Sequence, residues 1–210
     1  MEELRDKNGL TEAEFLAGYD MTKFDRPSLT ADNLIFSFEN GVSLLLIRRK
    51  GHPDLGKRAL PGGFVERGES AEEAVLRELE EETSLTGLKA YPAGFFSTPG
   101  RDPRGWVVTR SFIADVSGHE NEVKAGDDAA DARFFSLAAA RDGNRVTLCL
   151  RNGEETLSAA AEVKLEDGLT GRTWEITLLT AEGLAFDHAK IIIDALLRLE
   201  DGGKFGFDCI

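Results

Sequence analysis

Residues 63–85 read GFVERGESAEEAVLRELEEETSL, and the second half of this stretch places three glutamates on one face of a predicted helix. Glu78, Glu81 and Glu82 are spaced at i, i+3 and i+4, so their Cβ atoms would lie roughly 5–6 Å apart. Three carboxylates this close repel one another and destabilise an isolated helix. A hard divalent cation relieves the repulsion, because Mg²⁺ often takes one or two carboxylates together with substrate phosphates. The spacing therefore indicates a metal site for a phosphate-bearing partner.

The residues around the glutamates predict where this helix begins and ends. Ser70 is a good N-cap, and Glu73 falls three positions later and completes a capping box. The apolar face is expected to consist of Ala74, Val75 and Leu79. The helix is expected to end near Thr83 or Ser84, which places Glu81 and Glu82 in its last turn, where the helix dipole disfavours anions. A cation bound at this end would again explain the two acidic residues.

Taken alone, the glutamates also fit a solvated acidic helix face, and the wider pattern decides between the two interpretations. The pattern is Gly63, five residues, Glu69, seven residues, Arg77-Glu78-Leu79, one residue, Glu81-Glu82, one residue, Ser84-Leu85. It resembles the Nudix box of the Nudix hydrolases, and it departs from that box only at Ser84, where the family usually has Gly. A pattern fixed at so many positions is a far stronger signal than an isolated glycine motif.

The resemblance implies an enzyme that uses Mg²⁺, or Mn²⁺ as an alternative ion, to cleave a nucleoside diphosphate joined to another group. It implies Glu78, Glu81 and Glu82 as metal ligands, and Glu78 and Glu81 as catalytic residues. The metal would neutralise phosphate charge and acidify the attacking water. Arg77 would hold a carboxylate such as Glu69 or Glu78 in position, which suits a forked guanidinium better than an ammonium.

Further site residues are predicted outside the glutamates. Gly62 and Gly63 allow a close backbone approach to a ligand, with a purely structural role as the alternative. Arg101 and Arg104, in the loop STPGRDPRG, are candidate phosphate clamps, with surface salt bridges as the alternative. By resemblance the general base is a loop carboxylate outside the box, and Glu122 is preferred. The four candidates for this base are Glu120, Glu122, Asp127 and Asp128.

Composition and charge restrict the class of function. The chain has 210 residues, 41% of them hydrophobic and 30% charged, which is typical of a globular protein with one substantial domain. The net charge of −13 disfavours nonspecific nucleic-acid binding and requires a local positive patch or a metal to hold an anionic substrate. Cys149 and Cys209 make no disulfide framework, and neither a signal peptide nor a membrane-spanning run is evident. A cytoplasmic location and no membrane partner are expected.

Strand patterns, one helix after the box and another near the C-terminus indicate an α/β or α+β fold. The resemblance implies a Nudix-type mixed β-sheet sandwiched between helices. We predict an N-terminal arm at residues 1–28, a Nudix hydrolase domain at 29–210, and an added β-hairpin-like extension within it at 142–182. Strands are expected near residues 144–150, 154–163 and 172–180, and Asp187 is expected to cap a helix at 188–199. The resemblance also implies a homodimer.

The flanking sequences LPGGF, PGRDPRGWVVTRSFIAD and AFDHAKIII resemble a subgroup containing ADP-ribose pyrophosphatases and related regulators with a winged helix. The first hypothesis is hydrolysis of ADP-ribose to AMP and ribose 5-phosphate. The alternatives are a non-catalytic ADP-ribose-sensing transcription regulator and a house-cleaning pyrophosphatase for nucleoside triphosphates. Regulators need a basic DNA-reading element and tend to lose box glutamates, which this chain keeps. Arg58 stands where the family often has Trp, so nucleoside selection stays open.

Overall fold

The computed structural model describes residues 3–123, 131–169 and 171–209. The helices are α1 (Glu12–Ala17), α2 (Ala71–Thr83) and α3 (His188–Asp201), with 3₁₀ turns η1 (Met21–Lys23) and η2 (Glu120–Glu122). The strands are β1 (Ser28–Ser37), β2 (Ser43–Arg48), β3 (Arg58–Ala59), β4 (Gly62–Phe64), β5 (Tyr91–Phe96), β6 (Val107–Asp115), β7 (Ala132–Asp142), β8 (Arg145–Asn152), β9 (Glu155–Gly168), β10 (Gly171–Glu182) and β11 (Asp208–Cys209). None of the helices in the described ranges has the length and apolar character that crossing a membrane requires.

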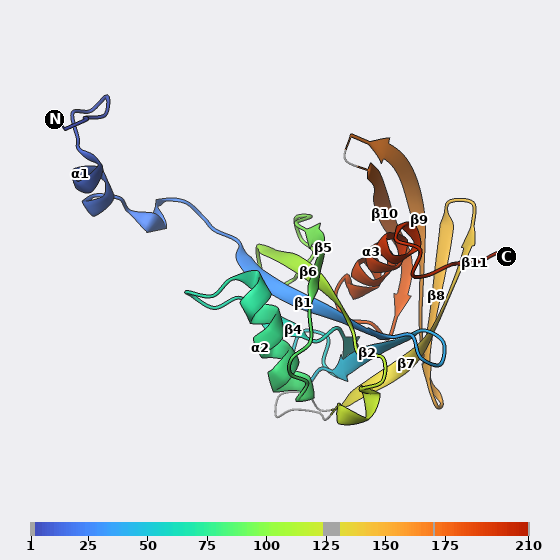
Figure 1. The fold of residues 1–210 in the computed structure, drawn as a ribbon. Coiled ribbons are helices and arrows are strands. Elements are labelled where there is room, and N and C mark those ends of the chain that lie inside the picture. The colour runs from blue at the N-terminus through green and yellow to red at the C-terminus, as the bar shows by residue number, and fades with distance from the viewer. Residues whose placement is uncertain (1–2, 124–130, 170, 210) are drawn as a thin grey trace.

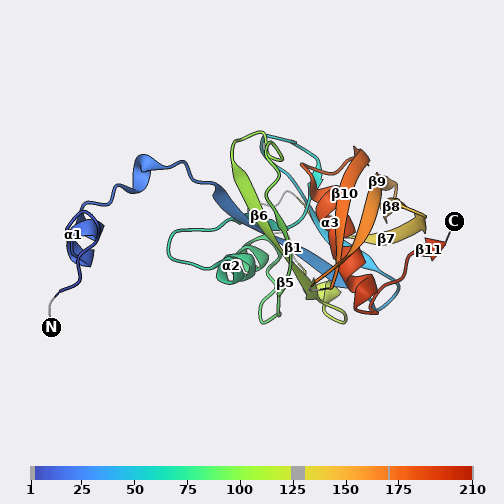
Figure 2. The same ribbon diagram turned by 90° about the horizontal axis from the view of Figure 1, so that it is seen from above.

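The strands form one mixed sheet in the order β10-β9-β8-β7-β2-β1-β6-β5, with β3 on β2, β4 on β1 and β11 on β7. The central pair, β1 and β6, is parallel, and β1 pairs with β2 in the antiparallel sense. Strands β5 and β10, at opposite ends of this order, both contact α3, so the sheet curls around that helix (Figure 1, Figure 2). The predicted mixed sheet between helices is therefore confirmed.

Strand β1 shows how the sequence builds two layers. Successive side chains of a strand point to opposite faces. Leu34 and Phe36 belong to the core that contains α3 residues, whereas Ala31 and Ile35 belong to the clusters packed against α2. Asp32 has the same parity as Leu34, so this acidic side chain lies on the α3 face of a strand that is buried on both sides.

Helix α2 begins with the expected capping box. The Ser70 hydroxyl accepts a hydrogen bond from the Glu73 N–H at 3.2 Å, and the Glu73 carboxylate accepts one from the Ser70 N–H at 2.8 Å. The helix ends at Thr83, and the exposed Ser84 that follows has φ 60° and ψ 11°. A non-glycine residue in this left-handed region costs roughly 1–2 kcal/mol. A turn that Gly would make without strain is therefore made here by Ser84 at a conformational cost.

Replacing Ser84 with Gly is expected to stabilise the protein by about 1 kcal/mol, because Gly adopts positive φ without steric penalty. The melting temperature should rise by roughly 2–4 °C for a chain of this size. Thermal denaturation measures the change. Ser97→Gly is the matched control, since Ser97 is exposed and its φ is not positive, and it should not raise the melting temperature. An unchanged or lower melting temperature for Ser84→Gly would contradict the argument.

The predicted strands at 144–150, 154–163 and 172–180 are present as β8, β9 and β10. They form an antiparallel meander that continues the sheet from β7. The predicted β-hairpin-like segment 142–182 contains three strands, β8, β9 and β10, which is one more than a simple hairpin, and β8 pairs directly with β7. The inner ends of β8 and β9 contribute Leu148, Leu150 and Leu157 to the core that includes α3.

A buried arginine ties this meander to the strand that precedes the box. Arg58 is fully buried, and its guanidinium donates to both Glu155 oxygens, at 3.0 and 2.7 Å, and to Asp131 at 2.9 Å. The guanidinium also lies 5.0 Å from the centroid of the Phe135 ring. Removing one partner of such a cluster would leave the other charged groups unpaired in a poorly solvated environment. Arg58 therefore anchors the start of β9 beside Leu60 and Pro61.

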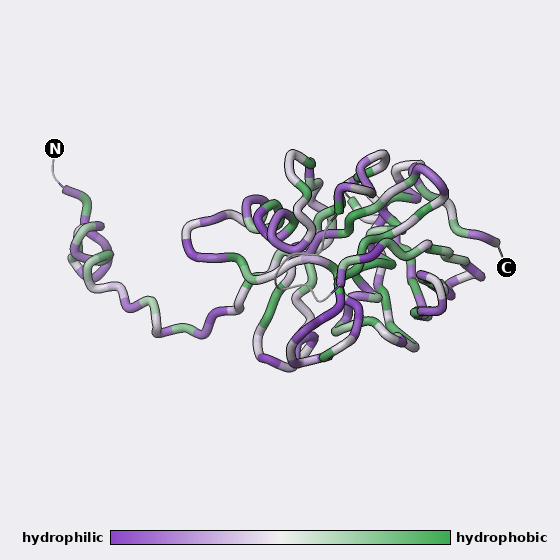
Figure 3. Tube along the Cα trace, turned by 90° about the horizontal axis from the view of Figure 1, so that it is seen from below, coloured by the Kyte–Doolittle hydropathy of each residue, from purple (hydrophilic) through white to green (hydrophobic). Residues whose placement is uncertain are grey.

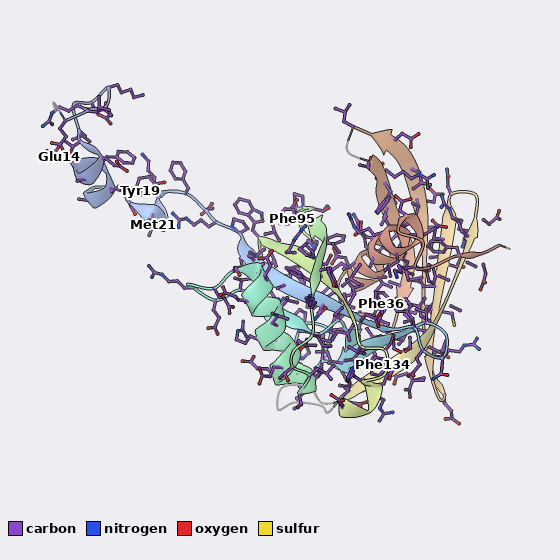
Figure 4. All side chains as sticks on the ribbon, in the orientation of Figure 1. Glu14, Tyr19, Met21, Phe36, Phe95 and Phe134 are labelled. Carbon is purple, nitrogen blue, oxygen red and sulfur yellow. The ribbon has the colours of Figure 1, made fainter. Side chains whose placement is uncertain are left out.

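The N-terminal segment extends away from the body of the molecule (Figure 1). Every residue from 3 to 27 is exposed except Thr11, which caps the six-residue helix α1. Tyr19 and Met21 lie on this segment, far from Phe36 and Phe134 in the body (Figure 4). Hydrophilic and hydrophobic stretches alternate along it (Figure 3). An isolated helix this short is marginal in water, so its capping box is the main local stabilisation.

Candidate active site

Two adjacent glycines bring strand β4 against β1 and α2. Gly62 has φ 149°, and a Cβ atom there would collide with the backbone oxygen of Ala31. A Cβ atom at Gly63 would collide with the carboxylate of Glu78. Backbone atoms therefore exclude a larger residue at Gly62, whereas a larger residue at Gly63 would displace the Glu78 carboxylate, and the glycine turn lies directly against the end of α2 that carries the acidic cluster.

The three clustered glutamates occupy different environments. Glu82 is buried, and its Oε2 accepts a hydrogen bond from the Gly62 N–H at 2.8 Å. Glu78 is half-buried beside Gly63, and burial raises the pKa of its carboxyl against the opposing effect of Arg77. The Glu81 side chain is 58% exposed and pairs with Arg77 at 3.1 Å. Two carboxylates therefore flank the glycine turn, and the third points outward.

Arg77 joins the acidic residues of the box. Its guanidinium donates to Glu69 at 2.8 and 3.2 Å, to Glu78 at 2.8 Å and to Glu81 at 3.1 Å, and a further hydrogen bond at 3.1 Å reaches the Phe64 backbone oxygen. Its hydrogen bonds to Glu69 raise the pKa of Arg77 further above its ordinary value. One planar group thus fixes the positions of two of the three predicted ligands.

The carboxylate oxygens of these glutamates are ligands that fit Mg²⁺, although the three side chains do not converge on one point. Across the described ranges, no group of three or more His, Cys, Asp or Glu side chains is arranged to hold a metal ion. Mg²⁺ commonly takes one or two carboxylates and fills its remaining positions with water and substrate phosphates. Glu78 and Glu82 lie beside the glycine turn, and Glu81 follows Glu78 by one helical turn. All three provide hard oxygen ligands of this kind.

Arg101 is fixed in position by hydrogen bonds to Asp187 and Thr109. Its side chain is only 6% exposed, and it donates to both carboxylate oxygens of Asp187, at 2.9 and 2.6 Å. A third N–H is donated to the Thr109 hydroxyl. A guanidinium has five N–H groups, so two remain for a ligand. This arrangement fixes Arg101 as a rigid donor of paired hydrogen bonds.

The expected cap of α3 is different in the structure. Asp187 stands at the N-cap position, but its side chain makes no capping hydrogen bond. The reason is that both of its oxygens accept from Arg101. The carboxylate positions a basic residue of the cavity and leaves the first turn of α3 uncapped by a side chain.

Two further arginines alternate with aromatic rings beside Arg101. The Arg104 guanidinium lies 4.9 Å from the Phe64 ring centroid and 5.1 Å from that of Phe186, and it pairs with Asp102 at 2.7 Å. The Arg49 guanidinium lies 4.6 Å from the Phe186 ring. Burial and the neighbouring Arg104 lower the pKa of Arg49. The stack concentrates positive charge opposite α2.

One small cavity, of about 100 Å³, connects these elements. Of the predicted residues, it is lined by Gly62, Gly63, Glu82, Arg101 and Arg104. Glu82 at the end of α2 therefore lines the same cavity as the Arg101 and Arg104 guanidinium groups, whereas Glu78 and Glu81 are not part of its lining. Such an arrangement can bind a metal ion and a polyphosphate together, because each neutralises charge that the other leaves uncompensated.

The model of the NUDIX domain matches residues 27–162 of the chain. The chain belongs to the Nudix family. It is 50% identical over 111 residues to an ADP-ribose pyrophosphatase of Methanocaldococcus jannaschii, a match that covers 53% of this chain and 63% of that protein. It is also 36% identical over 113 residues to the ADPR responsive transcriptional repressor NtrR of Acinetobacter baylyi, covering 52% of this chain and 45% of the repressor. The chain thus spans less than two thirds of both relatives.

A solved structure supports the fold over most of the chain. The MutT/nudix family protein from Enterococcus faecalis superposes with a TM-score of 0.71 at 37% identity, and the match covers 91% of this chain and 70% of that one. The family and the fold predicted from the sequence are both confirmed.

The candidate general bases of this Nudix protein lie away from the cavity or outside the described residues. Glu122 has a side chain that is 67% exposed, and it contacts the His119 ring nitrogen at 3.0 Å. Glu120 accepts hydrogen bonds from the Ser37 hydroxyl and the Gly118 N–H. Asp127 and Asp128 fall outside the described residues. The structure does not bring Glu122 to the lining of the cavity, and its role stays a prediction.

Sequence reasoning missed two buried titratable residues of the Nudix cavity, Asp32 and His188. Their exposed fractions are 7% and 6%. Burial raises the pKa of Asp32 to about 7, and Arg101 opposes this rise. Burial lowers the pKa of His188 to about 4. The available signals were an acidic residue inside an apolar strand and a histidine at the start of an apolar helix.

Proposed function

We propose that this Nudix protein is an Mg²⁺-dependent pyrophosphohydrolase that cleaves the diphosphate of a nucleoside diphosphate linked to another group. The observation that carries the proposal is a cavity lined by Glu82 from the acidic end of α2, by the Gly62–Gly63 turn, and by Arg101 and Arg104. In a chain with a net charge of −13, local cations and a metal are what an anionic substrate requires. The similarity to an ADP-ribose pyrophosphatase supports ADP-ribose as the preferred substrate, giving AMP and ribose 5-phosphate.

In this mechanism Glu78, Glu81 and Glu82 would hold the ion, and Arg77 would keep the first two in position. Bound Mg²⁺ supplies charge neutralisation at the phosphates and a more acidic attacking water. Arg101 donates its two remaining N–H groups to non-bridging phosphate oxygens, with the strength of charge-assisted hydrogen bonds. Arg104 adds a second cation beside it.

A substrate panel tests the proposal. We expect ADP-ribose to be hydrolysed in the presence of Mg²⁺ with a kcat/KM at least tenfold above those for NADH, sugar nucleotides and deoxynucleoside triphosphates. EDTA should abolish turnover, and Mn²⁺ should restore it. Products are identified by chromatography as AMP and ribose 5-phosphate. Hydrolysis that favours a deoxynucleoside triphosphate would support the house-cleaning alternative. A lack of hydrolysis for every compound would refute the proposed enzymatic function.

The regulator alternative rests on the similarity to the ADPR responsive repressor. Such a protein would bind DNA in an ADP-ribose-dependent way, and the net charge of −13 opposes the phosphate contacts that this needs. A mobility-shift assay with and without ADP-ribose distinguishes the two functions. The homodimer and the cytoplasmic location inferred from the sequence stay proposals, and analytical ultracentrifugation tests the former.

A further inference from the structure

Asp32 is a buried carboxyl without a hydrogen-bond partner. It lines the cavity from β1, and its side chain is 10% exposed. Among residues 3–123, 131–169 and 171–209, its carboxyl oxygens make no hydrogen bond, and the His188 Nε2 lies 3.8 Å from its Oδ2. Buried carboxyls are costly unless they are paired. Burial raises the pKa of Asp32 to about 7, so above that pH the ionised carboxyl faces the cavity as an acceptor that a ligand could satisfy.

The hydrogen on His188 is placed by its other ring nitrogen. The Leu60 N–H donates to His188 Nδ1 at 2.9 Å. An acceptor nitrogen carries no hydrogen, so the neutral ring bears its hydrogen on Nε2. Burial keeps the ring neutral by lowering its pKa to about 4. His188 therefore presents a fixed N–H donor on the side of Asp32.

Together the two side chains offer an acceptor and a donor 3.8 Å apart. A hydroxyl oxygen about 2.8 Å from both atoms would lie to one side of the line that joins them, where it can donate to Asp32 and accept from His188 at the same time, because hydroxyl groups do both. A phosphate oxygen has no hydrogen to donate when it is ionised, and a carboxylate would repel it. The other cavity carboxylates are already engaged, Glu82 by the Gly62 N–H and Asp102 by Arg104.

We propose that Asp32 and His188 form a hydroxyl-binding pair that selects substrates carrying a free sugar hydroxyl close to the diphosphate. This inference rests on the proposed diphosphate hydrolysis and adds to it a specificity determinant. Arg101 and Arg104 bind the charged part of the substrate, and the Asp32–His188 pair reads its neutral, hydroxylated part. A hydrogen bond between a hydroxyl and a charged partner corresponds to about 10- to 100-fold in affinity.

The test combines Asp32→Asn with ADP-ribose analogues that lack one ribose hydroxyl each. For intact ADP-ribose, Asp32→Asn should raise KM about tenfold with little change in kcat, because the amide oxygen can still accept but lacks the charge that strengthens the hydrogen bond. For the analogue that lacks the recognised hydroxyl, the same substitution should change KM less than threefold. His188→Gln should reduce discrimination against that same analogue, and it serves if Asp32→Asn fails to fold. Asp142→Asn, an exposed carboxylate on β7, is the control.

The remaining outcomes of this test would each overturn the inference or the proposed function. An equal rise in KM for every analogue would overturn the pair as a hydroxyl reader. A fall in kcat shared by all substrates would instead identify Asp32 as a proton-transfer group, and the inference would fail. If the wild type hydrolyses none of the compounds, the proposed function fails. Calorimetric binding of the same analogues to wild type and Asp32→Asn then decides the inference, and equal affinities would overturn it.

Discussion

Replacing Glu82 with Gln is expected to lower Mg²⁺-dependent kcat by about 10³-fold while the protein stays folded. Glu82 accepts a hydrogen bond from the Gly62 N–H, and the amide oxygen of Gln can accept the same bond. The glycine turn therefore keeps its partner. What disappears is a negative charge at the buried end of α2, and with it one predicted ligand. The expected loss corresponds to about 4 kcal/mol of transition-state stabilisation.

Glu80→Gln is the matched control for this variant. Glu80 is exposed on the same helix and does not line the cavity, so its replacement should leave kcat within threefold of wild type. Glu81→Gln should lower turnover in the same direction as Glu82→Gln. Calorimetric titration with Mg²⁺ should show weaker binding for both box variants and unchanged binding for Glu80→Gln. Wild-type turnover by Glu82→Gln at equal melting temperature would remove the metal assignment.

Features encoded over a few neighbouring residues were predictable from the sequence. The capping box at Ser70, the end of α2 at Ser84 and the strands of the meander depend on short-range patterns, and the structure contains them. The two box glycines were predictable for the same reason, although the residues that exclude a Cβ atom there were not. Gly62 is restricted by β1, and Gly63 by Glu78 on α2. Such contacts depend on how separate elements pack.

The parts of the site that sequence reasoning missed are all long-range pairs. Asp32 and His188 come from β1 and α3, which meet only because the sheet curls around that helix. Asp187 had a strong local interpretation as a helix cap, yet a guanidinium from another loop takes both of its oxygens. The choice of Glu122 as general base depended on loop position alone. One sequence without contacts cannot rank such candidates, because several carboxylates share the same local pattern.

Replacing Arg101 with Lys is expected to lower kcat/KM for ADP-ribose by about 100-fold. An ammonium keeps the charge but loses the planar fork that engages Asp187 and a phosphate together. This loss should appear mainly as a higher KM, because the contact stabilises the ground state as well as the transition state. Arg172→Lys is the control, since Arg172 lies on β10, is exposed and forms an ion pair with Asp201. A kcat/KM within threefold of wild type would show that Arg101 is only a structural ion pair.

Asp187→Asn separates positioning from simple charge. If Asp187 acts by fixing Arg101, the Asn variant should lose about tenfold in kcat/KM, and the loss should vanish when Arg101 is already Lys. Residues that act as one unit show such non-additivity. Removing a carboxylate also makes the cavity more positive, which by electrostatics alone would favour an anionic substrate. The two explanations therefore predict opposite signs, and a gain in kcat/KM for Asp187→Asn would reject the positioning role.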